Sequence, residues 1–355
     1  MAEPSVVAAE LDSAETQRDP GASDLDPVSR IILDEAGDLG DVVLVVDDAD
    51  GALAAAALEH GARVLAACDD IRDEELLPTG VTPVDLTAEP DLSEVTTVLW
   101  RLPKAVAAVE DVAEVLALRC APDVRVYGGA RDKHLVPAMN DALRASFGEV
   151  SASRGQQKSR VLRASAPTSP ARTWPHLATN TELGLDVLAH GNVFGGTTLD
   201  RGTRLLLRAL HHEQPVSGRA LDLGCGSGIV AAVLAGLGWD VLACDASAAA
   251  VASTTLTAEA NGFGIVARRA DGIPLDVAGL DLVACNPPFH RGAAKDSSAA
   301  FAMVADAGRA LRQGGELWLV FNSHLPYLPV ARDQVGPTRV VVRDQSYVVT
   351  CSTRR

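Results

Sequence analysis

The fold is decided by residues 220–230, which read ALDLGCGSGIV. An apolar run typical of a buried strand ends at Leu223, and an Ala/Val/Leu-rich stretch typical of a helix follows. Between them stand three alternating glycines, Gly224, Gly226 and Gly228. Glycine permits a positive φ and lets a ligand approach the backbone without obstruction by a Cβ. Because the amides at a helix start are free to donate, this strand-loop-helix pattern predicts a nucleotide-type binding site.

Two details of the loop favour S-adenosylmethionine over a dinucleotide as the ligand. The spacing is GxGxG, whereas a pyrophosphate is held by GxGxxG. Asp222 lies inside the strand before the loop, where its carboxylate is placed to meet the cationic methionine end. Asp245 ends the next strand and is expected to accept both ribose hydroxyls, and Asp271 follows the third strand as a candidate for the adenine amine. Helix capping or turn formation is the alternative role for Asp245 and Asp271.

A second motif, Asn286-Pro287-Pro288-Phe289, follows the apolar run 280–285. Two prolines fix φ and remove two amide donors, so the carbonyls here have few internal partners. We expect the Asn286 side-chain oxygen and the Pro287 carbonyl to accept the two hydrogens of an exocyclic amine, beside the bound cofactor. Phe289 is expected to stack on a flipped or unpaired base. Catalysis would then rest on orientation and electrostatics, with no covalent intermediate.

Strand-like and helix-like stretches alternate from residue 42 onward, which predicts α/β layers on mostly parallel sheets. We expect strands over residues 42–46, 62–67, 97–100, 124–127, 220–223, 240–244, 265–268, 280–285, 316–321, 340–342 and 346–350. The last two are expected to close the second sheet as an antiparallel pair.

The chain also contains an internal repeat at a shift of 177 residues. GALAAAALEHGARVLAACD (51–69) lies over GIVAAVLAGLGWDVLACDA (228–246), with glycines meeting glycines. The copies differ where chemistry is expected, because Asp47 and Cys68 stand where the second copy has Gly224 and Asp245. We therefore expect two tandem Rossmann-like units, the first without a cofactor. The expected organisation is a disordered acidic tail over 1–27, a degenerate unit over 28–150, a basic linker over 151–181 and a catalytic unit over 182–355.

The net charge of −16 argues against a nucleic-acid binder when taken for the whole chain. It divides unevenly, however, into −20 over residues 1–149 and +4 over residues 150–355. Residues 150–181 contain five Lys or Arg and no Asp or Glu, as suits either a solvated linker or a phosphate-contacting strip.

No apolar run is long enough for a membrane-spanning helix, and the acidic N-terminus is unlike a secretory signal. The six cysteines form no CxxC pair, so we expect free buried thiols, a reducing cytoplasm and no metal site. The duplication makes a monomer sufficient. His290, beside the second motif, is expected to have a structural or substrate-positioning role rather than that of a base.

With these motifs in place, roughly residues 40–350 resemble the bacterial rRNA guanine-N2 methyltransferases that modify small- or large-subunit RNA. In the second copy the resemblance rests on LDLGCGSG (221–228), NPPFH (286–290) and NVFGGTTLDRGTRLLL (192–207). In the first copy, WRLPKAVAAVED (100–111) and YGGARDKHLVPAM (127–139) resemble the large-subunit branch.

The resemblance implies a class I S-adenosylmethionine enzyme with two tandem methyltransferase-like units, the first of which has lost the cofactor and assists folding and RNA recognition. It implies methyl transfer to the exocyclic 2-amino group of a guanine in ribosomal RNA, presented as naked RNA, a ribosomal subunit or an assembly particle. Family members usually carry Ser-Arg or Ser-Gly after the Val-Phe pair, whereas this chain has Gly195-Gly196. Thr198 and Asp200 remain as caps and cofactor-lid residues.

Other interpretations stay open at this point. NPPF and NPPY elements also serve adenine-N6 and protein-glutamine methyltransferases, and the duplication and the basic segment favour RNA. A non-catalytic RNA-binding assembly factor is a third possibility, and the intact Asp245 and Asn286 count against it. A nicotinamide-dependent oxidoreductase would need GxGxxG spacing, which the loop lacks.

Overall fold

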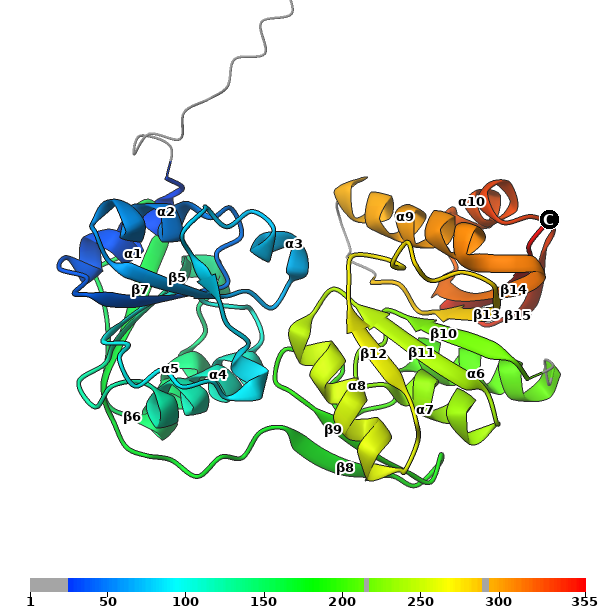
Figure 1. Cartoon of the computed structure of the whole chain (residues 1–355), viewed down its shortest axis with the longest axis horizontal. Helices are drawn as coiled ribbons and strands as arrows, with labels where there is room; N and C mark the ends of the chain where they lie inside the picture. Colours follow the sequence, from blue (N-terminus) through cyan, green and yellow to red (C-terminus); the bar gives the residue numbers. More distant parts are fainter. Residues whose placement is uncertain (1–24, 214–216, 289–293) are drawn as a thin grey trace, which may run out of the picture.

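The computed structural model describes residues 25–213, 217–288 and 294–355, so almost all of the expected tail 1–27 lies outside the described residues. Two α/β halves lie side by side (Figure 1). The N-terminal half contains α1 (Pro27–Ala36), β1 (Val42–Val46), α2 (Ala52–Glu59), β2 (Arg63–Ala67), α3 (Ile71–Glu74), β3 (Thr82–Pro83), η1 (Leu86–Ala88), β4 (Thr97–Arg101), α4 (Val106–Arg119), β5 (Arg125–Arg131), η2 (Asp132–His134), α5 (Pro137–Ser146), β6 (Phe147–Ala152) and β7 (Ser159–Pro167).

The C-terminal half begins with a separate two-stranded hairpin and continues into the second large sheet. Its elements are β8 (His176–Asn180), β9 (Leu185–Ala189), α6 (Arg201–Glu213), β10 (Arg219–Leu223), α7 (Ile229–Gly236), β11 (Asp240–Asp245), α8 (Ala248–Ala260), β12 (Val266–Arg269), β13 (Leu280–Cys285), α9 (Ala294–Ala310), β14 (Leu311–Asn322), α10 (Tyr327–Gln334), β15 (Thr338–Arg343) and β16 (Tyr347–Thr353).

The two large sheets have the same topology. Their strand orders are β3-β2-β1-β4-β5-β7-β6 and β12-β11-β10-β13-β14-β16-β15, each with seven strands. The last two pairings of each order are antiparallel, and the other four are parallel. Val46 pairs with Ala67 in the first sheet and Leu223 with Cys244 in the second, positions that are 177 residues apart. The predicted mostly parallel α/β fold is confirmed, and the repeat extends to the register of the strands.

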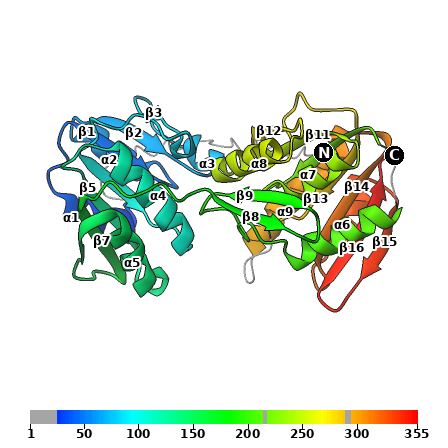
Figure 2. The ribbon, with the colours of Figure 1, turned by 90° about the horizontal axis from the view of Figure 1, so that it is seen from below.

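Helices cover both faces of each sheet (Figures 1 and 2). In β1, for example, Leu44 and Val46 pack into one apolar cluster and Val43 and Val45 into another. A strand buried on both faces reads as a continuous apolar run rather than as an alternation. This is why β1 and β13 begin and end at the residues that the sequence predicted.

The basic segment 151–181, in contrast, is not a linker over its whole length. Residues 159–167 form β7, which pairs with both β5 and β6 inside the first sheet. Val161 and Leu162 are buried, while Arg160 and Arg163 are exposed. The exposed basic positions interrupt the apolar pattern of this strand. Composition alone therefore predicted a linker here.

Arg172, from the same segment, lies in a half-buried ionic network and does not face solvent freely. Its guanidinium contacts Asp111 at 2.6 Å, Glu114 at 2.9 Å and Glu89 at 3.0 Å. His190 contacts the second oxygen of Asp111 at 2.9 Å, so the network joins the two halves. The interpretation of Arg172 as part of a phosphate-contacting strip is therefore wrong.

Candidate active site

The glycine loop joins β10 to α7 and has the backbone that the glycines allow. Gly224, Gly226 and Gly228 have φ values of 77°, 54° and 77°. At Gly228 a Cβ would lie 2.9 Å from the Cα of Thr254, which α8 packs against the loop. Both the positive φ and the close approach require glycine at this position.

Three predicted site residues lie at the ends of adjacent strands of the second sheet or directly after them. The end of β10 pairs with the ends of both β11 and β13, so Gly224, Asp245 and Asn286 lie at one edge. In an α/β sheet the carboxyl ends of the parallel strands form the usual ligand crevice. Asp271 comes two residues after Arg269, the last residue of the next strand outward, β12. The Asp271 side chain is 61% exposed.

Asp222 is buried beneath the loop, with 2% of its surface exposed. One of its carboxylate oxygens accepts a hydrogen bond of 3.0 Å from the amide of Ala231 in α7. Burial, with Asp245 nearby, raises the pKa of Asp222 to about 7. The structure thus uses one side of this carboxyl to hold α7 against β10.

Asp245 is held at the open edge by two backbone amides. Its Oδ1 accepts from the amide of Ser247 at 3.0 Å and its Oδ2 from the amide of Gly226 at 3.1 Å. Burial raises the pKa of Asp245, while the two amides act in the opposite direction. Each carboxylate oxygen can accept more than one hydrogen bond, so acceptor capacity remains for two hydroxyls of a ligand.

The Asn286 carboxamide has one satisfied end and one free end. Its Nδ2 donates to the Thr203 hydroxyl at 2.9 Å and lies 3.4 and 3.5 Å from the two carboxylate oxygens of Asp200. A carboxylate only accepts hydrogen bonds, so the amide NH₂ must face Asp200. The opposite atom, Asn286 Oδ1, is buried and has no hydrogen-bond partner within the part of the chain that the structure describes.

The rest of the second motif is only partly described. Pro287 is buried and Pro288 is exposed, whereas Phe289 and His290 lie outside the described residues.

The sequence predicted Asp200 as a cap, which is confirmed, but it did not predict the contacts of Asn286 with Thr203 and Asp200. Asp200 caps α6 by accepting from the amides of Gly202 and Thr203 at 2.8 and 3.2 Å. The capping signal was readable from the Asp-Arg-Gly-Thr sequence, but the contact with Asn286 spans more than 80 residues and carries no local pattern.

Within residues 25–213, 217–288 and 294–355 no group of three or more His, Cys, Asp or Glu side chains is arranged to hold a metal ion. No helix in the described part of the chain is long and apolar enough to cross a membrane.

Comparison with known proteins gives two family matches and relatives that align over most of their length. The methyltransferase small domain family matches residues 184–351, and the RLMG N-terminal domain family matches residues 31–168. Ribosomal RNA large subunit methyltransferase G of Pseudomonas syringae pv. tomato is 35% identical over 80% of this chain and 80% of that protein. The protein of the same name from Streptomyces avermitilis is 32% identical over 88% of this chain and 87% of its own length.

Among solved structures, the 16S rRNA N2 methyltransferase of T. thermophilus, in complex with AdoMet and guanosine, superposes with a TM-score of 0.79. The alignment covers 93% of this chain and 92% of that chain at 24% sequence identity, so it speaks for the fold of both halves together. The sheet order, the glycine loop and these matches define an S-adenosylmethionine-dependent methyltransferase. The chain belongs to the ribosomal RNA large subunit methyltransferase G family.

Proposed function

We propose that this protein transfers a methyl group from S-adenosylmethionine to the exocyclic 2-amino group of a guanine in large-subunit ribosomal RNA. The observation that carries the proposal is the buried, unpartnered Oδ1 of Asn286 at the carboxyl end of β13. A buried acceptor without a donor is costly unless a ligand supplies one. The names of the relatives, and the guanosine bound to the T. thermophilus enzyme, support guanine and rRNA as the matching donor.

The donor set at this edge fits the proposed cofactor. In our proposal the amides of the loop Gly224–Gly228 and the carboxylate of Asp245 hold S-adenosylmethionine, with Asp271 and Asn286 at its border. The positive φ values leave the loop open to a ligand, and Asp245 keeps free acceptor capacity. Asp222, whose Ala231 contact places it under the loop, acts on the cofactor through the position of α7. When bound, the cofactor supplies an electrophilic methyl group.

The residues of this chain then orient the amine. A guanine 2-amine is a poor nucleophile because its lone pair is delocalised into the ring. Asn286 Oδ1 and the Pro287 carbonyl accept its two hydrogens, which favours a pyramidal nitrogen whose lone pair points out of the ring plane. The amine proton leaves to water once the N–C bond has formed, so no side chain has to act as a base. Pro288 fixes the backbone of this element, and Phe289 stacks on the base.

RNA contact is proposed for exposed cations of the β6–β7 hairpin. Arg154 and Lys158 are exposed, and neither forms an ion pair with any described residue. Arg160 and Arg163, in contrast, lie 3.4 Å from Asp132 and Glu35, respectively. Free cations near a phosphate backbone release counterions on binding. The acidic N-terminal half then contacts RNA locally, without a cofactor of its own.

The proposal is tested by methylation of large-subunit rRNA transcripts, followed by mass spectrometry of the nucleosides. Wild-type protein should produce N2-methylguanosine, and Asn286→Ala should abolish it while calorimetry shows unchanged S-adenosylmethionine binding. Gln313→Ala, which removes an exposed carboxamide elsewhere, is the matched control. N6-methyladenosine as the product, or near-wild-type turnover of Asn286→Ala, would overturn the proposal.

A further inference from the structure

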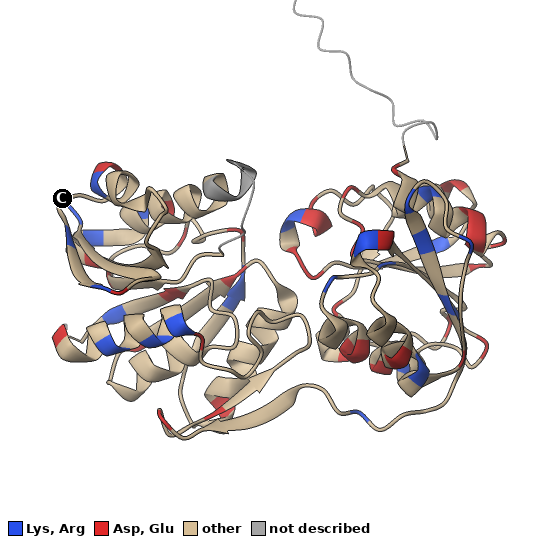
Figure 3. Cartoon of the chain, turned by 180° about the vertical axis from the view of Figure 1, so that it is seen from behind, with Lys and Arg blue, Asp and Glu red and all other residues tan. Residues whose placement is uncertain are grey.

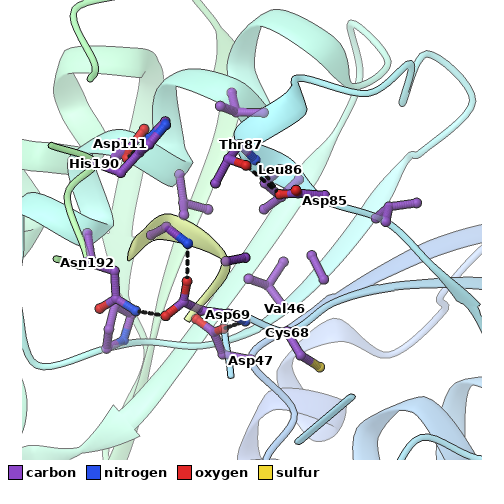
Figure 4. Close-up of a pocket in the computed structure, with 18 of the residues that line it drawn as sticks. Val46, Asp47, Cys68, Asp69, Asp85, Leu86, Thr87, Asp111, His190 and Asn192 are labelled. Carbon is purple, nitrogen blue, oxygen red and sulfur yellow. Dashed lines mark hydrogen bonds and ion pairs between the residues drawn. The ribbon is translucent and has the colours of Figure 1, made fainter. Parts of the chain in front are cut away.

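A carboxylate of the N-terminal half reaches across to the C-terminal half. Asp69 follows β2, and its Oδ1 accepts from the Ser247 hydroxyl at 3.0 Å and from the Ala249 amide at 2.9 Å. Its Oδ2 accepts from the side-chain amide of Asn192 at 2.6 Å, and its backbone carbonyl accepts from the Ala248 amide at 2.8 Å. Figure 4 shows the Asn192 side chain pointing at Asp69. Asp69 therefore helps to cap α8, a helix of the other half.

This contact lies beside the position that corresponds to the proposed ligand-binding carboxylate of the second copy. By strand register, Cys68 is the counterpart of Asp245, and Asp69 is the next residue. The cavity at this edge of the first sheet has a volume of about 60 Å³, and its lining includes His190, Asn192 and Arg269 of the C-terminal half. Ligand pockets for drug-sized molecules are several hundred Å³, so this space is much smaller than such a pocket.

Both segments that Asp69 contacts border the glycine loop. Ser247 donates its amide to Asp245, the proposed ribose-binding carboxylate. Asn192 precedes Val193, whose side chain lies 3.9 Å from the position of a Cβ on Gly226. One side chain thus ties the loop after β11 to the loop before α6, on two sides of the cofactor crevice.

Neighbouring residues strengthen the same connection. The amide of Ile71 donates to the carbonyl of Ala246 at 3.0 Å, and Asp70 forms an antiparallel bridge with Ser247. Arg269 of β12 donates to the Cys68 carbonyl at 2.5 Å and pairs with Glu74 at 2.6 Å. Figure 2 shows α3 next to the start of α8, and Figure 3 shows α3 carrying both signs of charge on the side that faces the C-terminal half.

We propose that Asp69 is a positioning residue for the cofactor crevice of the C-terminal half. The N-terminal half completes that crevice with the edge of its own sheet that corresponds to the cofactor site of the second sheet. This inference rests on the proposed cofactor site at Asp245. Its action is indirect: Asp69 fixes the loop that presents Asp245 and the loop that covers Gly226.

The test is S-adenosylmethionine binding to the full-length protein without RNA, measured by calorimetry. Asp69→Ala should raise the Kd about tenfold, the effect of losing roughly one net hydrogen bond of positioning. Asp69→Asn should bind within about threefold of wild type, because its oxygen can still accept from Ser247 and Ala249 while its NH₂ donates to a flipped Asn192 carboxamide. Asp123→Ala, at an exposed turn of the same half, is the control.

Hydrogen exchange of the unliganded protein gives a second readout. Amides 246–250 should exchange faster in Asp69→Ala than in wild type or Asp69→Asn, with little change in the cores of the sheets. If Asp69→Ala fails to fold, Asn192→Ala removes only the exposed hydrogen bond between Asn192 and Asp69, and it should also raise the Kd. An unchanged Kd in whichever of these variants folds would overturn the inference. Since RNA is absent from these measurements, failure to methylate guanine would overturn the proposed function alone.

Discussion

Because the Asp200 carboxylate orients the Asn286 carboxamide, the near-isosteric substitution Asp200→Asn should reverse that orientation. The new side chain can keep its oxygen on the amides of Gly202 and Thr203, because asparagine caps helices as well as aspartate does. Its NH₂ group then replaces the carboxylate oxygen that lies 3.4 Å from Asn286 Nδ2. Two donors would face each other, so the Asn286 carboxamide should turn over and present its NH₂ to the substrate amine.

The size of the effect follows from the length of the contacts. A hydrogen bond to a charged group contributes about 1.5–3 kcal/mol, and distances of 3.4 and 3.5 Å place this one near the lower limit. A preference of about 1.5 kcal/mol holds the oxygen-outward orientation at roughly 10:1 in the wild type. Reversing it leaves roughly one molecule in ten correctly oriented, so kcat should fall about tenfold while the Kd for S-adenosylmethionine stays the same.

Asp200→Ala is the discriminating comparison. It removes the acceptor without adding a donor, so Thr203 still holds the Asn286 amide at 2.9 Å and kcat should fall less than in Asp200→Asn. It also removes the cap of α6, which should cost about 1 kcal/mol of the free energy of unfolding. The kcat should therefore be highest in the wild type, lower in Asp200→Ala and lowest in Asp200→Asn. The free energy of unfolding should be equal in the wild type and Asp200→Asn and lower in Asp200→Ala. Single-turnover kinetics and urea denaturation measure the two orders, and a common order for both would refute the reasoning.

Three further predictions concern stability and RNA binding. Burial raises the pKa of Asp222 to about 7, so the protonated carboxyl stabilises the fold fully below about pH 4, and this stabilisation is lost as the pH rises towards 7. In denaturation curves, Asp222→Asn should remove a fall in the free energy of unfolding of up to about 1.4 kcal/mol per pH unit over this range. Gly228→Ala should destabilise the protein more than Gly238→Ala, since both have positive φ but only the first Cβ meets a neighbour; equal melting temperatures would contradict this. Reversing Arg154 and Lys158 to Glu should weaken RNA binding and flatten its salt dependence in titrations, and unchanged affinity would remove the hairpin from the interface.

The sequence predicted the elements whose signal is local. Strands buried on both faces appeared as apolar runs. The alternating glycines predicted both the positive φ values of the loop and the helix α7 that follows it. Strand β7 was missed because its exposed positions carry arginines, so its burial pattern is mixed. The basic charge of residues 150–181 led to a wrong prediction for Arg172. This residue counts as basic, but its guanidinium is paired with buried carboxylates and is not available to phosphates.

The candidate site could be predicted only as far as its motifs. Asp245 and Asn286 stand at strand ends, where a pattern exists to be read. The partners that orient them come from distant parts of the chain, since Asp200 is 86 residues from Asn286 and Asp69 is 180 residues from Ala249. Such pairings are set by the packing of whole elements, and no spacing along the chain encodes them.

The cap that Asp69 places on α8 also bears on how the duplicated gene could have evolved. Once a residue of the first copy took over amides of the second, loss of the first copy would leave those amides without their partner. A shortened gene encoding the second copy alone would have to acquire a new cap in the same step that removed the old one. The redundancy that duplication first created was therefore converted into mutual dependence, and a return to the single-copy ancestor became a two-step path with an unstable intermediate.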